Sequence, residues 1–314
     1  MTRVLIADPL GADGIALMQH RLAVTVAGEN DVASLLPGSE ALIVRSRTRV
    51  TDDLLARGDD LRLVARAGIG VDNIDVDAAT RRGILVVNAP YASVRSAAEH
   101  TLALMLAAAR RLPAADAGVR SGAWRTGYSG TQLAGKTLGV IGAGKIGRQV
   151  ALLGAAIGMD VMAHDPYLPP AAWNDLGLTS RPLDDLLAVS DVVTLHIPLL
   201  PETRHLLDET RLARMKSGAI LVNCARGGLV DEAAVAVCLA DGHLSAAAFD
   251  VFEDEPPAGS PLLTAPNVVL TPHVAASTRE AQAHVSVEIA HQVLDYFAGR
   301  PVAHAINPSV LGVS

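Results

Sequence analysis

The sequence predicts an α/β fold that is built from two doubly wound parallel sheets. Short apolar runs recur along the 314 residues, segments of helical character separate most of them, and both halves of the chain follow this plan. The runs are apolar throughout rather than at alternate positions, as is typical of strands that helices cover on both faces. Strands and helices that alternate in this way form parallel sheets with right-handed crossovers.

The first hundred residues contain five expected strands, followed by a long helix that we expect to begin near residue 97. Ser96 and Glu99 form a capping-box pattern, in which a serine at the cap is followed three residues later by a glutamate. The apolar residues behind this pattern recur at the spacing of a buried helical face. The strands are expected at Val4–Ala7, Ala23–Ala27, Ala41–Arg45, Leu63–Ala65 and Ile84–Asn88.

A second series of strands is expected after a polar, glycine-rich loop over residues 121–135. The chain then closes with a helix at about residues 278–297 and a short tail. The second series is expected at Leu138–Ile141, Val161–His164, Val192–His196, Ile220–Asn223, Ala246–Phe249 and Val268–Leu270.

The composition excludes several classes of protein. Half of the residues are hydrophobic, which is too many for a disordered chain, and the 3 Phe, 2 Trp and 4 Tyr indicate an aliphatic core. The net charge of −7 gives no general basic field for nucleic acid or an anionic membrane. An anionic small molecule would therefore need a local cluster of cations.

The first residues lack the apolar stretch of a signal peptide, and already have the character of a strand. Cys224 and Cys238, the two cysteines of the chain, form neither a metal-type pair nor a disulfide framework. We therefore expect a cytoplasmic protein without a bound metal.

A glycine-rich motif indicates a dinucleotide site. Gly142, Gly144 and Gly147 match G-x-G-x-x-G, directly after an expected strand and at the start of an expected helix over residues 146–157. The three glycines allow a tight turn, a close approach to a pyrophosphate and close packing of helix on strand. Asp165 ends the next strand, where a carboxylate accepts from ribose hydroxyls and repels a 2′-phosphate, so NAD is favoured over NADP.

Three ionic residues lie just past later strands, where open α/β sheets bind their ligands. They are Arg226, Glu255 and His273. An arginine binds a carboxylate through two parallel hydrogen bonds, and a histidine takes the proton of a hydroxyl as hydride leaves. A carboxylate beside that histidine orients the ring and favours its charged form. These residues therefore suit hydride transfer to or from a 2-hydroxy or 2-oxo acid.

The sequence resembles the D-isomer-specific 2-hydroxyacid dehydrogenases over nearly its whole length. The motifs that carry the resemblance are residues 44–48, 66–75, 96–99, 223–232 and 272–273. Within the family it is most similar to the branch that acts on D-3-phosphoglycerate. The resemblance implies that Arg226 binds the substrate carboxylate, His273 is the acid/base and Glu255 is its partner.

The resemblance also implies which residues bind the ligands. For several of them a purely structural or surface role is the alternative. Asp250 is either a contact on the nicotinamide side or a structural carboxylate, and His196 either lines the cofactor or is structural. Arg45 and Arg66 either bind the far end of the substrate or form surface ion pairs. The expected cofactor contacts are Ile69, Gly142, Gly144, Lys145, Ile146, Gly147, Asp165, Ile197, Cys224, Ala225 and Asp250. The expected substrate contacts are Arg45, Ser46, Arg66, Gly68, Gly70 and Arg226.

Family members combine a flavodoxin-like lid domain, made from both termini, with a Rossmann nucleotide-binding domain inserted into it. This implies a lid over residues 1–96 and 284–314, a nucleotide domain over 97–283, and a substrate cleft that closes during hydride transfer. The family is usually dimeric through its nucleotide domains, and the loop around Trp124 is a candidate contributor to a homodimer.

Two departures from the family pattern leave the acid open. Residues 91–95 replace an Asn-Gly-Asn-Ser-like stretch, and Ala275 replaces a glycine. Because the chain stops at Ser314, we expect a short form without a regulatory domain. A hydroxypyruvate or glyoxylate reductase is the alternative within the family. An NAD-binding co-repressor or sensor is the alternative outside it, and the acidic charge balance argues against that class.

Overall fold

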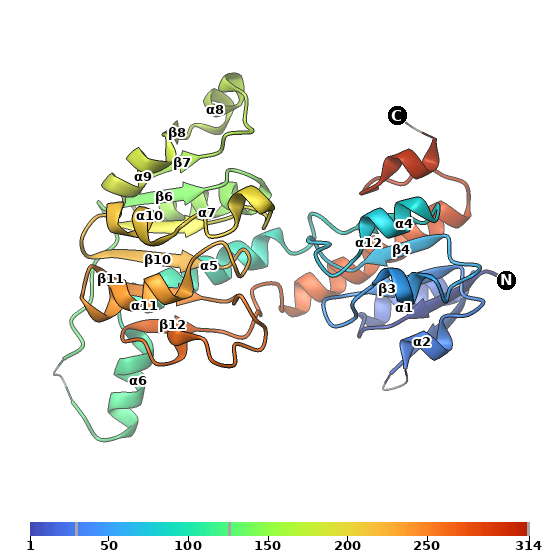
Figure 1. The fold of residues 1–314 in the computed structure, drawn as a ribbon, viewed down its shortest axis with the longest axis horizontal. Coiled ribbons are helices and arrows are strands. Elements are labelled where there is room, and N and C mark those ends of the chain that lie inside the picture. Colours follow the sequence, from blue (N-terminus) through green and yellow to red (C-terminus); the bar gives the residue numbers. More distant parts are fainter. Residues whose placement is uncertain (29–30, 125–126, 313–314) are drawn as a thin grey trace. The chain divides into compact units, whose positions relative to one another are not determined.

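The computed structural model describes residues 1–28, 31–124 and 127–312, and it divides the chain into two compact units (Figure 1). Unit 1 comprises Met1–Ser93 and Ser277–Ser314, and unit 2 comprises Val94–Ala276, so the second is inserted into the first. Unit 1 has a sheet of five strands and unit 2 a sheet of seven, and every pairing between neighbouring strands of these sheets is parallel. The predicted fold class is therefore confirmed.

Unit 1 has the strand order β2-β1-β3-β4-β5. All four residues of β3 are buried; Ala41 and Ile43 join one apolar cluster, and Leu42 and Val44 join the other. Because successive side chains point to opposite faces, both faces of this sheet are covered. The elements are β1 (Arg3–Ile6), α1 (Ala12–Gln19), β2 (Ala23–Val26), α2 (Val32–Leu35), β3 (Ala41–Val44), α3 (Asp52–Leu55), β4 (Leu63–Arg66), α4 (Val76–Arg81), β5 (Leu85–Asn88), α12 (Arg279–Phe297) and a 3₁₀ turn η3 (Pro308–Leu311).

Unit 2 has the strand order β12-β11-β10-β9-β6-β7-β8. Helices α5 and α7 pack on one face of the sheet, and α9, α10 and α11 bury side chains in the cluster on the other. The elements are α5 (Val94–Ala109), α6 (Leu112–Arg120), β6 (Thr137–Ile141), α7 (Lys145–Ala156), β7 (Asp160–His164), α8 (Pro170–Leu176), β8 (Thr179–Ser180), α9 (Leu183–Val189), β9 (Val192–Leu195), η1 (Pro201–Thr203), α10 (Glu209–Arg214), β10 (Ala219–Asn223), α11 (Glu232–Ala240), β11 (Leu244–Phe249), η2 (Pro261–Leu263) and β12 (Val268–Leu270).

The predicted start of the long helix near residue 97 is wrong by about one turn. Helix α5 begins at Val94, so Ser96 lies inside the helix rather than at its cap. Glu99 does not serve a capping box either, because it accepts a hydrogen bond of 2.6 Å from Arg95, four residues earlier. An (i, i+4) ion pair on the first turns has taken the place of the expected cap.

The helix that follows α5 was not expected. Arg111 has a left-handed backbone with φ of 52°, and Pro113 stands in the first turn of α6, so the chain breaks between the two helices. Residues 125 and 126 of the expected loop over 121–135 lie outside the described residues. The short strand β8 was also unexpected, since its Thr179 and Ser180 are exposed and carry no apolar signal.

The limits of the units differ from the sequence-based domain limits of 96/97 and 283/284. The second expected limit falls inside α12, which is one continuous helix that packs on α1 of unit 1. Thr278 caps this helix, because its Oγ1 accepts a hydrogen bond from the Ala281 amide at 3.1 Å. In the described residues, no helix combines the length and the apolar character that are needed to cross a membrane.

Candidate active site

The strands of unit 2 end in line with one another, which gathers the expected site residues at one edge of the sheet. The pairing aligns Asn223 of β10 with Phe249 of β11, and Phe249 with Leu270 of β12. It also aligns Asn223 with Leu195 of β9, and Leu195 with Ile141 of β6. The loops that follow these residues carry the glycine motif, Ile197, Arg226, Asp250 and His273, so all of them lie along this edge.

The glycine motif has the geometry of a tight turn with one open side. A Cβ at Gly142, where φ is 94°, would clash with the His196 carbonyl oxygen, and a Cβ at Gly147 would clash with the Gly142 carbonyl oxygen. At Gly144 a Cβ would meet no atom within 4 Å. Gly144 also precedes the first turn of α7, whose amide groups suit an anion. The turn therefore fits a pyrophosphate at its open side.

Asp165 lies beside this turn at the end of β7. One carboxylate oxygen accepts a hydrogen bond of 3.0 Å from the Ala143 amide, and the other accepts one of 3.0 Å from the Tyr167 amide. Each oxygen keeps a second acceptor position, as a carboxylate has about four. The carboxylate thus keeps acceptor positions next to the motif, where a ribose is expected from the sequence.

The loop after β10 is shaped by Asn223, whose side chain is buried. Its Nδ2 donates to the Arg226 carbonyl at 2.9 Å, and its Oδ1 accepts from the Ala225 amide at 3.0 Å. The half-buried Arg226 donates from Nη1 to the Ala225 carbonyl at 2.6 Å. Asn223 thereby bends the chain so that Arg226 follows the strand in a fixed loop.

Asp250 lies directly after β11 and is fully buried. It accepts hydrogen bonds from the Thr271 hydroxyl at 2.6 Å and from the amides of Val274 and Ala275 at 2.9 and 2.8 Å. Burial alone would raise the pKa of Asp250, but these donors and His100 outweigh it and hold the pKa below its ordinary value. Asp250 is therefore an ionised anchor for the loop after β12.

His273 and Glu255 form a pair at the surface of this edge. His273 Nδ1 lies 2.7 Å from Glu255 Oε2, and the Phe252 amide donates to Glu255 Oε1 at 3.2 Å. The side chains are 45% and 39% exposed, so both can be reached by a small molecule. Burial opposes ionisation of Glu255, but the hydrogen bond and charge of His273 hold its pKa below the ordinary value. Glu255 is thus ionised and accepts, and Nδ1 carries the proton.

Burial sets the protonation state of Cys224, an expected cofactor contact, and of His196, for which the sequence leaves a cofactor contact and a structural role open. Burial raises the pKa of the Cys224 thiol to about 12, so it stays protonated and inert. Burial lowers the pKa of His196 to about 3, and its Nε2 lies 3.0 Å from Thr194 Oγ1. Both side chains therefore remain neutral at physiological pH. Ile146 and Ile197 are half-buried, Ala225 is buried, and Lys145 is exposed.

The site contains residues that sequence reasoning did not single out. His100 on α5 lies 3.1 Å from Thr271 Oγ1 and 3.4 Å from Asp250 Oδ1. It stands 171 residues from Thr271, and one histidine among ten carries no signal that could have paired it with this loop. Asn223 could have been found, because an amide side chain at a strand end often shapes the following turn.

The expected substrate residues of unit 1 lie in loops at the carboxyl ends of its strands. The buried Asp8 after β1 accepts hydrogen bonds from the Arg45 amide at 2.6 Å and from the Thr48 hydroxyl at 2.8 Å. Asn73 donates to the carbonyls of Arg45 and Thr48, at 2.7 Å each. The loop over residues 45–48, with exposed Ser46, is therefore held from two sides.

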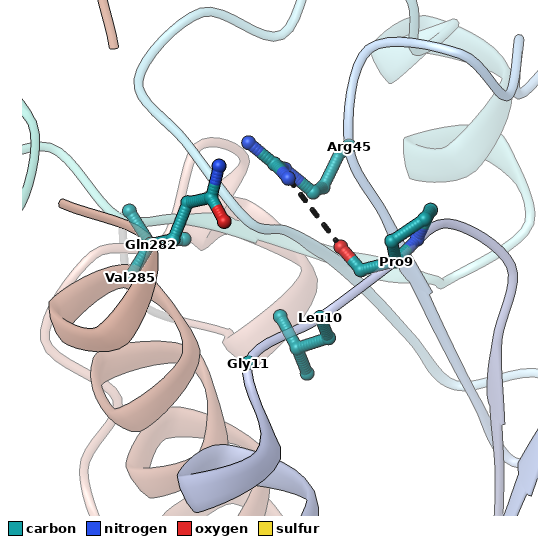
Figure 2. Close-up of a pocket in the computed structure, with 6 residues that line it drawn as sticks. All are labelled: Pro9, Leu10, Gly11, Arg45, Gln282 and Val285. Atoms are coloured by element: carbon teal, nitrogen blue, oxygen red, sulfur yellow. Dashed lines mark hydrogen bonds between the residues drawn. The ribbon is translucent and has the colours of Figure 1, made fainter. Parts of the chain in front are cut away.

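A small hollow of about 80 Å³ opens beside Arg45 (Figure 2). Arg45 Nη1 lies 3.5 Å from the Pro9 carbonyl oxygen, and Figure 2 shows Gln282 of α12 on the facing side. No ion pair of Arg45 is present among the described residues, so the surface salt bridge that was the alternative reading of this residue is not formed there.

The second expected loop of unit 1, over residues 66–70, is pinned to β5. Asn88 Nδ2 donates to the Ile69 carbonyl at 2.5 Å, and the Ala89 amide donates to the Gly68 carbonyl at 2.9 Å. Gly68 has φ of 153°, and a Cβ there would clash with the guanidinium of Arg66, which lies over it. Ile69 and Gly70 are half-buried in this loop.

The comparison with protein families shows to which family the chain belongs. Residues 102–275 match the NAD-binding domain of the D-isomer specific 2-hydroxyacid dehydrogenases. The chain belongs to this family. The match covers more than half of the chain and lies within unit 2, so NAD is the cofactor of that domain and the predicted resemblance is confirmed.

Comparisons over nearly the whole of this chain agree with the family. A D-3-phosphoglycerate dehydrogenase of Mycobacterium bovis is 49% identical over 308 residues, which is 97% of this chain and 58% of the relative. The chain thus spans less than two thirds of the length of that relative.

Solved structures reproduce the fold. One from Thermus thermophilus has a TM-score of 0.89 and 36% identity, covering 97% of this chain and 100% of the other. A D-lactate dehydrogenase from Aquifex aeolicus, in complex with NAD and lactic acid, has a TM-score of 0.83 and 30% identity, covering 95% of this chain and 96% of the other. The substrates of the family are small 2-hydroxy acids, as the sequence predicts. In the described residues, no cluster of three or more His, Cys, Asp or Glu side chains could hold a metal ion.

Proposed function

We propose that this chain is an NAD-dependent dehydrogenase that interconverts D-3-phosphoglycerate and 3-phosphohydroxypyruvate. The hydroxy acid and NAD⁺ would give the oxo acid, NADH and one proton. The observation that carries this chemistry is the 2.7 Å hydrogen bond between His273 and Glu255, at the edge of an NAD-binding domain. The choice of acid is supported by relatives named D-3-phosphoglycerate dehydrogenase that are 42–49% identical to the chain.

His273 is proposed as the acid/base. Since its Nδ1 donates to the ionised Glu255, the free Nε2 takes the proton of the substrate hydroxyl as C2 loses hydride. The imidazolium that forms is stabilised by the carboxylate opposite it. In the reverse direction the same Nε2 returns the proton to the oxygen of the oxo acid. NAD, when bound, supplies the hydride acceptor.

Arg226 is proposed to bind the substrate carboxylate. Its guanidinium offers a planar pair of donors that matches a carboxylate, and the Asn223 hydrogen bonds hold its loop in place. The positive charge also stabilises the negative charge that develops on the substrate during hydride transfer.

The cofactor is proposed to lie along the carboxyl edge of the unit 2 sheet. The open side of Gly144 would receive the pyrophosphate with Gly142, Lys145, Ile146 and Gly147, and Asp165 would bind the adenosine ribose. The remaining contacts would come from Ile197, Cys224, Ala225 and Asp250, with Ile69 from the other unit.

Unit 1 is proposed to be the substrate-binding lid domain. Arg45 and Arg66 would bind the phosphate of the substrate, with Ser46, Gly68 and Gly70 nearby in the same two loops. The hollow of about 80 Å³ beside Arg45 is of the size of a small anionic group. The loops are preorganised by Asp8, Asn73 and Asn88, which reduces the cost of binding.

A homodimer through the nucleotide-binding domain is proposed as the assembly. Helix α6 buries only Gly118 of its nine residues, while Leu112, Val119 and the nearby Trp124 are 52%, 56% and 68% exposed. Such a group of apolar side chains suits a second copy of the chain. We also propose that the enzyme acts in the cytoplasm, as its two free cysteines suit a reducing compartment.

A panel of oxo acids tests the proposed function. Oxidation of NADH and of NADPH is measured with phosphohydroxypyruvate, hydroxypyruvate and glyoxylate, at one defined pH. We expect the highest kcat/KM with phosphohydroxypyruvate and NADH. A preference for hydroxypyruvate or glyoxylate would move the enzyme to the reductase alternative. NADH binding without turnover of any acid would favour the NAD-binding sensor.

A further inference from the structure

We propose that Glu232 is a positioning residue that fixes the Glu255 carboxylate opposite His273. The inference rests on the proposed function, because it deepens the role of the same acid/base pair. Glu232 is the first residue of α11, yet it is only 8% exposed. A glutamate at the start of a helix is ordinarily solvated, so its burial calls for a specific partner.

Both carboxylate oxygens of Glu232 bind the loop that carries Glu255. Oε1 accepts a hydrogen bond of 2.7 Å from the Glu253 amide, and Oε2 accepts a hydrogen bond from the Ser260 hydroxyl. The two donors lie on either side of Glu255 in the chain. Glu232 therefore holds the loop by hydrogen bonds at two points, before and after the residue that faces His273.

The hydrogen bonds of Glu232 act on the acid/base pair through consecutive peptide groups. The Glu253 amide is held by Glu232, and the preceding amide of Phe252 donates to Glu255 Oε1 at 3.2 Å. Glu255 Oε2 is then left to meet His273 Nδ1 at 2.7 Å. Because the peptide unit is planar, the Glu253 N–H and the Phe252 carbonyl move together, and only the φ and ψ of Phe252 separate this unit from the amide that binds Glu255.

A short segment of the chain also connects Glu232 with Arg226. Residues 226–232 run from the substrate arginine to the start of α11. A Cβ at Gly227 would clash with the Phe252 carbonyl, so this connection lies directly against the Glu255 loop. Glu232 thus braces two loops that must keep a common geometry during hydride transfer, where small misplacements are costly.

Stabilisation of α11 alone does not account for this residue. Asp231 already caps the helix, since its Oδ1 accepts from the amides of Ala233 and Ala234 at 3.0 Å each. Helix α10 has the same Asp-Glu start, in which Asp208 is the cap and Glu209 is exposed. Glu209 therefore provides a matched control for the charge at a helix start.

The test compares Glu232→Ala, Glu232→Gln and Glu209→Ala with the wild type. Glu232→Ala leaves the Glu253 amide without its acceptor, and we expect kcat to fall about tenfold, which is less than the roughly 10²–10⁴-fold that acid/base catalysis contributes as a whole. KM for the oxo acid and the affinity for NADH should change less than about twofold. Glu232→Gln retains one oxygen acceptor and should restore most of the rate. Glu209→Ala should behave as the wild type.

The pH profile and a double variant separate positioning from general destabilisation. With Glu255 displaced, the imidazolium loses its counter-charge, so the alkaline limb of oxo-acid reduction should move to lower pH in Glu232→Ala. In a Glu255→Gln background, Glu232→Ala should cause little further loss of kcat, because the carboxylate that it positions is already gone. Equal losses in both backgrounds, or an unmoved alkaline limb, would overturn the inference.

A measurement without turnover keeps the inference separate from the proposed function. Hydrogen exchange at the amides of residues 252–255 should be faster in Glu232→Ala than in Glu209→Ala. If the wild type reduces no oxo acid, the proposed function fails, and the exchange result alone then decides the inference that Glu232 holds this loop. Unchanged exchange in that segment would overturn it.

Discussion

Two acid–histidine pairs meet at the loops after β11 and β12, and they differ in exposure and in what they bind. Glu255 and His273 both belong to these loops, whereas Asp250 pairs with His100 of helix α5. Glu255 and His273 meet at 2.7 Å and are 39% and 45% exposed. Asp250 and His100 are 3.4 Å apart, and Asp250 is fully buried. The pKa of each carboxyl lies below its ordinary value, although the donors that lower it are different.

The carboxylates of Asp250 and Glu255 differ in which donors they bind. Asp250 binds the Thr271 hydroxyl and two amides of the loop after β12, so it fixes backbone. His273 in that loop has a left-handed backbone with φ of 54°, and its amide donates to the Asp250 carbonyl at 2.8 Å. Glu255 binds the ring of the same histidine. The buried pair thus holds the backbone of His273, and the exposed pair holds its side chain.

Replacing His273 by glutamine should have the largest effect on turnover. The amide cannot take or return a proton at Nε2, so we expect a loss of roughly 10²–10⁴-fold in kcat. Steady-state oxidation of NADH with the preferred oxo acid measures it. NADH binding, followed by fluorescence, should match the wild type, because the cofactor contacts proposed for this domain remain. Substantial remaining turnover would mean that another residue is the acid/base.

Replacing Glu255 by glutamine should have the next largest effect. The change removes the charge that stabilises the imidazolium, and we expect kcat to fall by roughly 10- to 100-fold, less than for His273. The pKa of Glu255 lies below its ordinary value of 4.5, so in the wild type it remains charged throughout a pH range of about 5–9. The alkaline limb of reduction should therefore move to lower pH in the variant. An unmoved alkaline limb would show that the charge of Glu255 does not stabilise the imidazolium of His273.

How far the sequence predicts this site is clear from the two pairs. Arg226, Glu255 and His273 follow apolar strands, and parallel strands end at a common edge, so their neighbourhood could be inferred from the strand pattern alone. The donors of Asp250 could not, because three of them lie 21–25 residues later in a loop without a periodic pattern. Contacts between His100 and this loop depend on how α5 packs, which is decided by tertiary contacts far apart in the chain.

The fold shows the same boundary between what is predictable and what is not. Strands such as β3 and β10 are buried on both faces, so their apolar runs are visible in the sequence. The two exposed residues of β8 carry no such run. At α5, the pattern of Ser96 and Glu99 is equally compatible with an ion pair inside the helix, and the Arg95–Glu99 pair prevails.

Replacing Asp250 by asparagine tests the buried pair through stability. One oxygen becomes an NH₂ group that faces a backbone donor, and we expect a loss of about 1–3 kcal/mol in the free energy of unfolding at pH 7. Since the folded pKa lies below the ordinary 3.8, the contribution of Asp250 is present above that value and is lost as pH falls through the folded pKa. Urea unfolding at several pH values should give a constant difference between pH 7 and 5, which shrinks only below about 4. A difference that vanished at pH 6 would contradict the lowered pKa.

Replacing His100 by glutamine should have the smallest effect of the four. The glutamine amide can still donate towards Thr271 Oγ1 or Asp250 Oδ1, and Asp250 keeps its bonds to Thr271, Val274 and Ala275. We therefore expect kcat to change less than about threefold and the unfolding free energy by about 1 kcal/mol or less. The matched comparison is His273→Gln, the same exchange in the exposed pair. If His100→Gln instead abolished turnover while NADH still bound, the buried histidine would take part in the chemistry, and the division between a pair that holds backbone and a pair that moves protons would have to be abandoned.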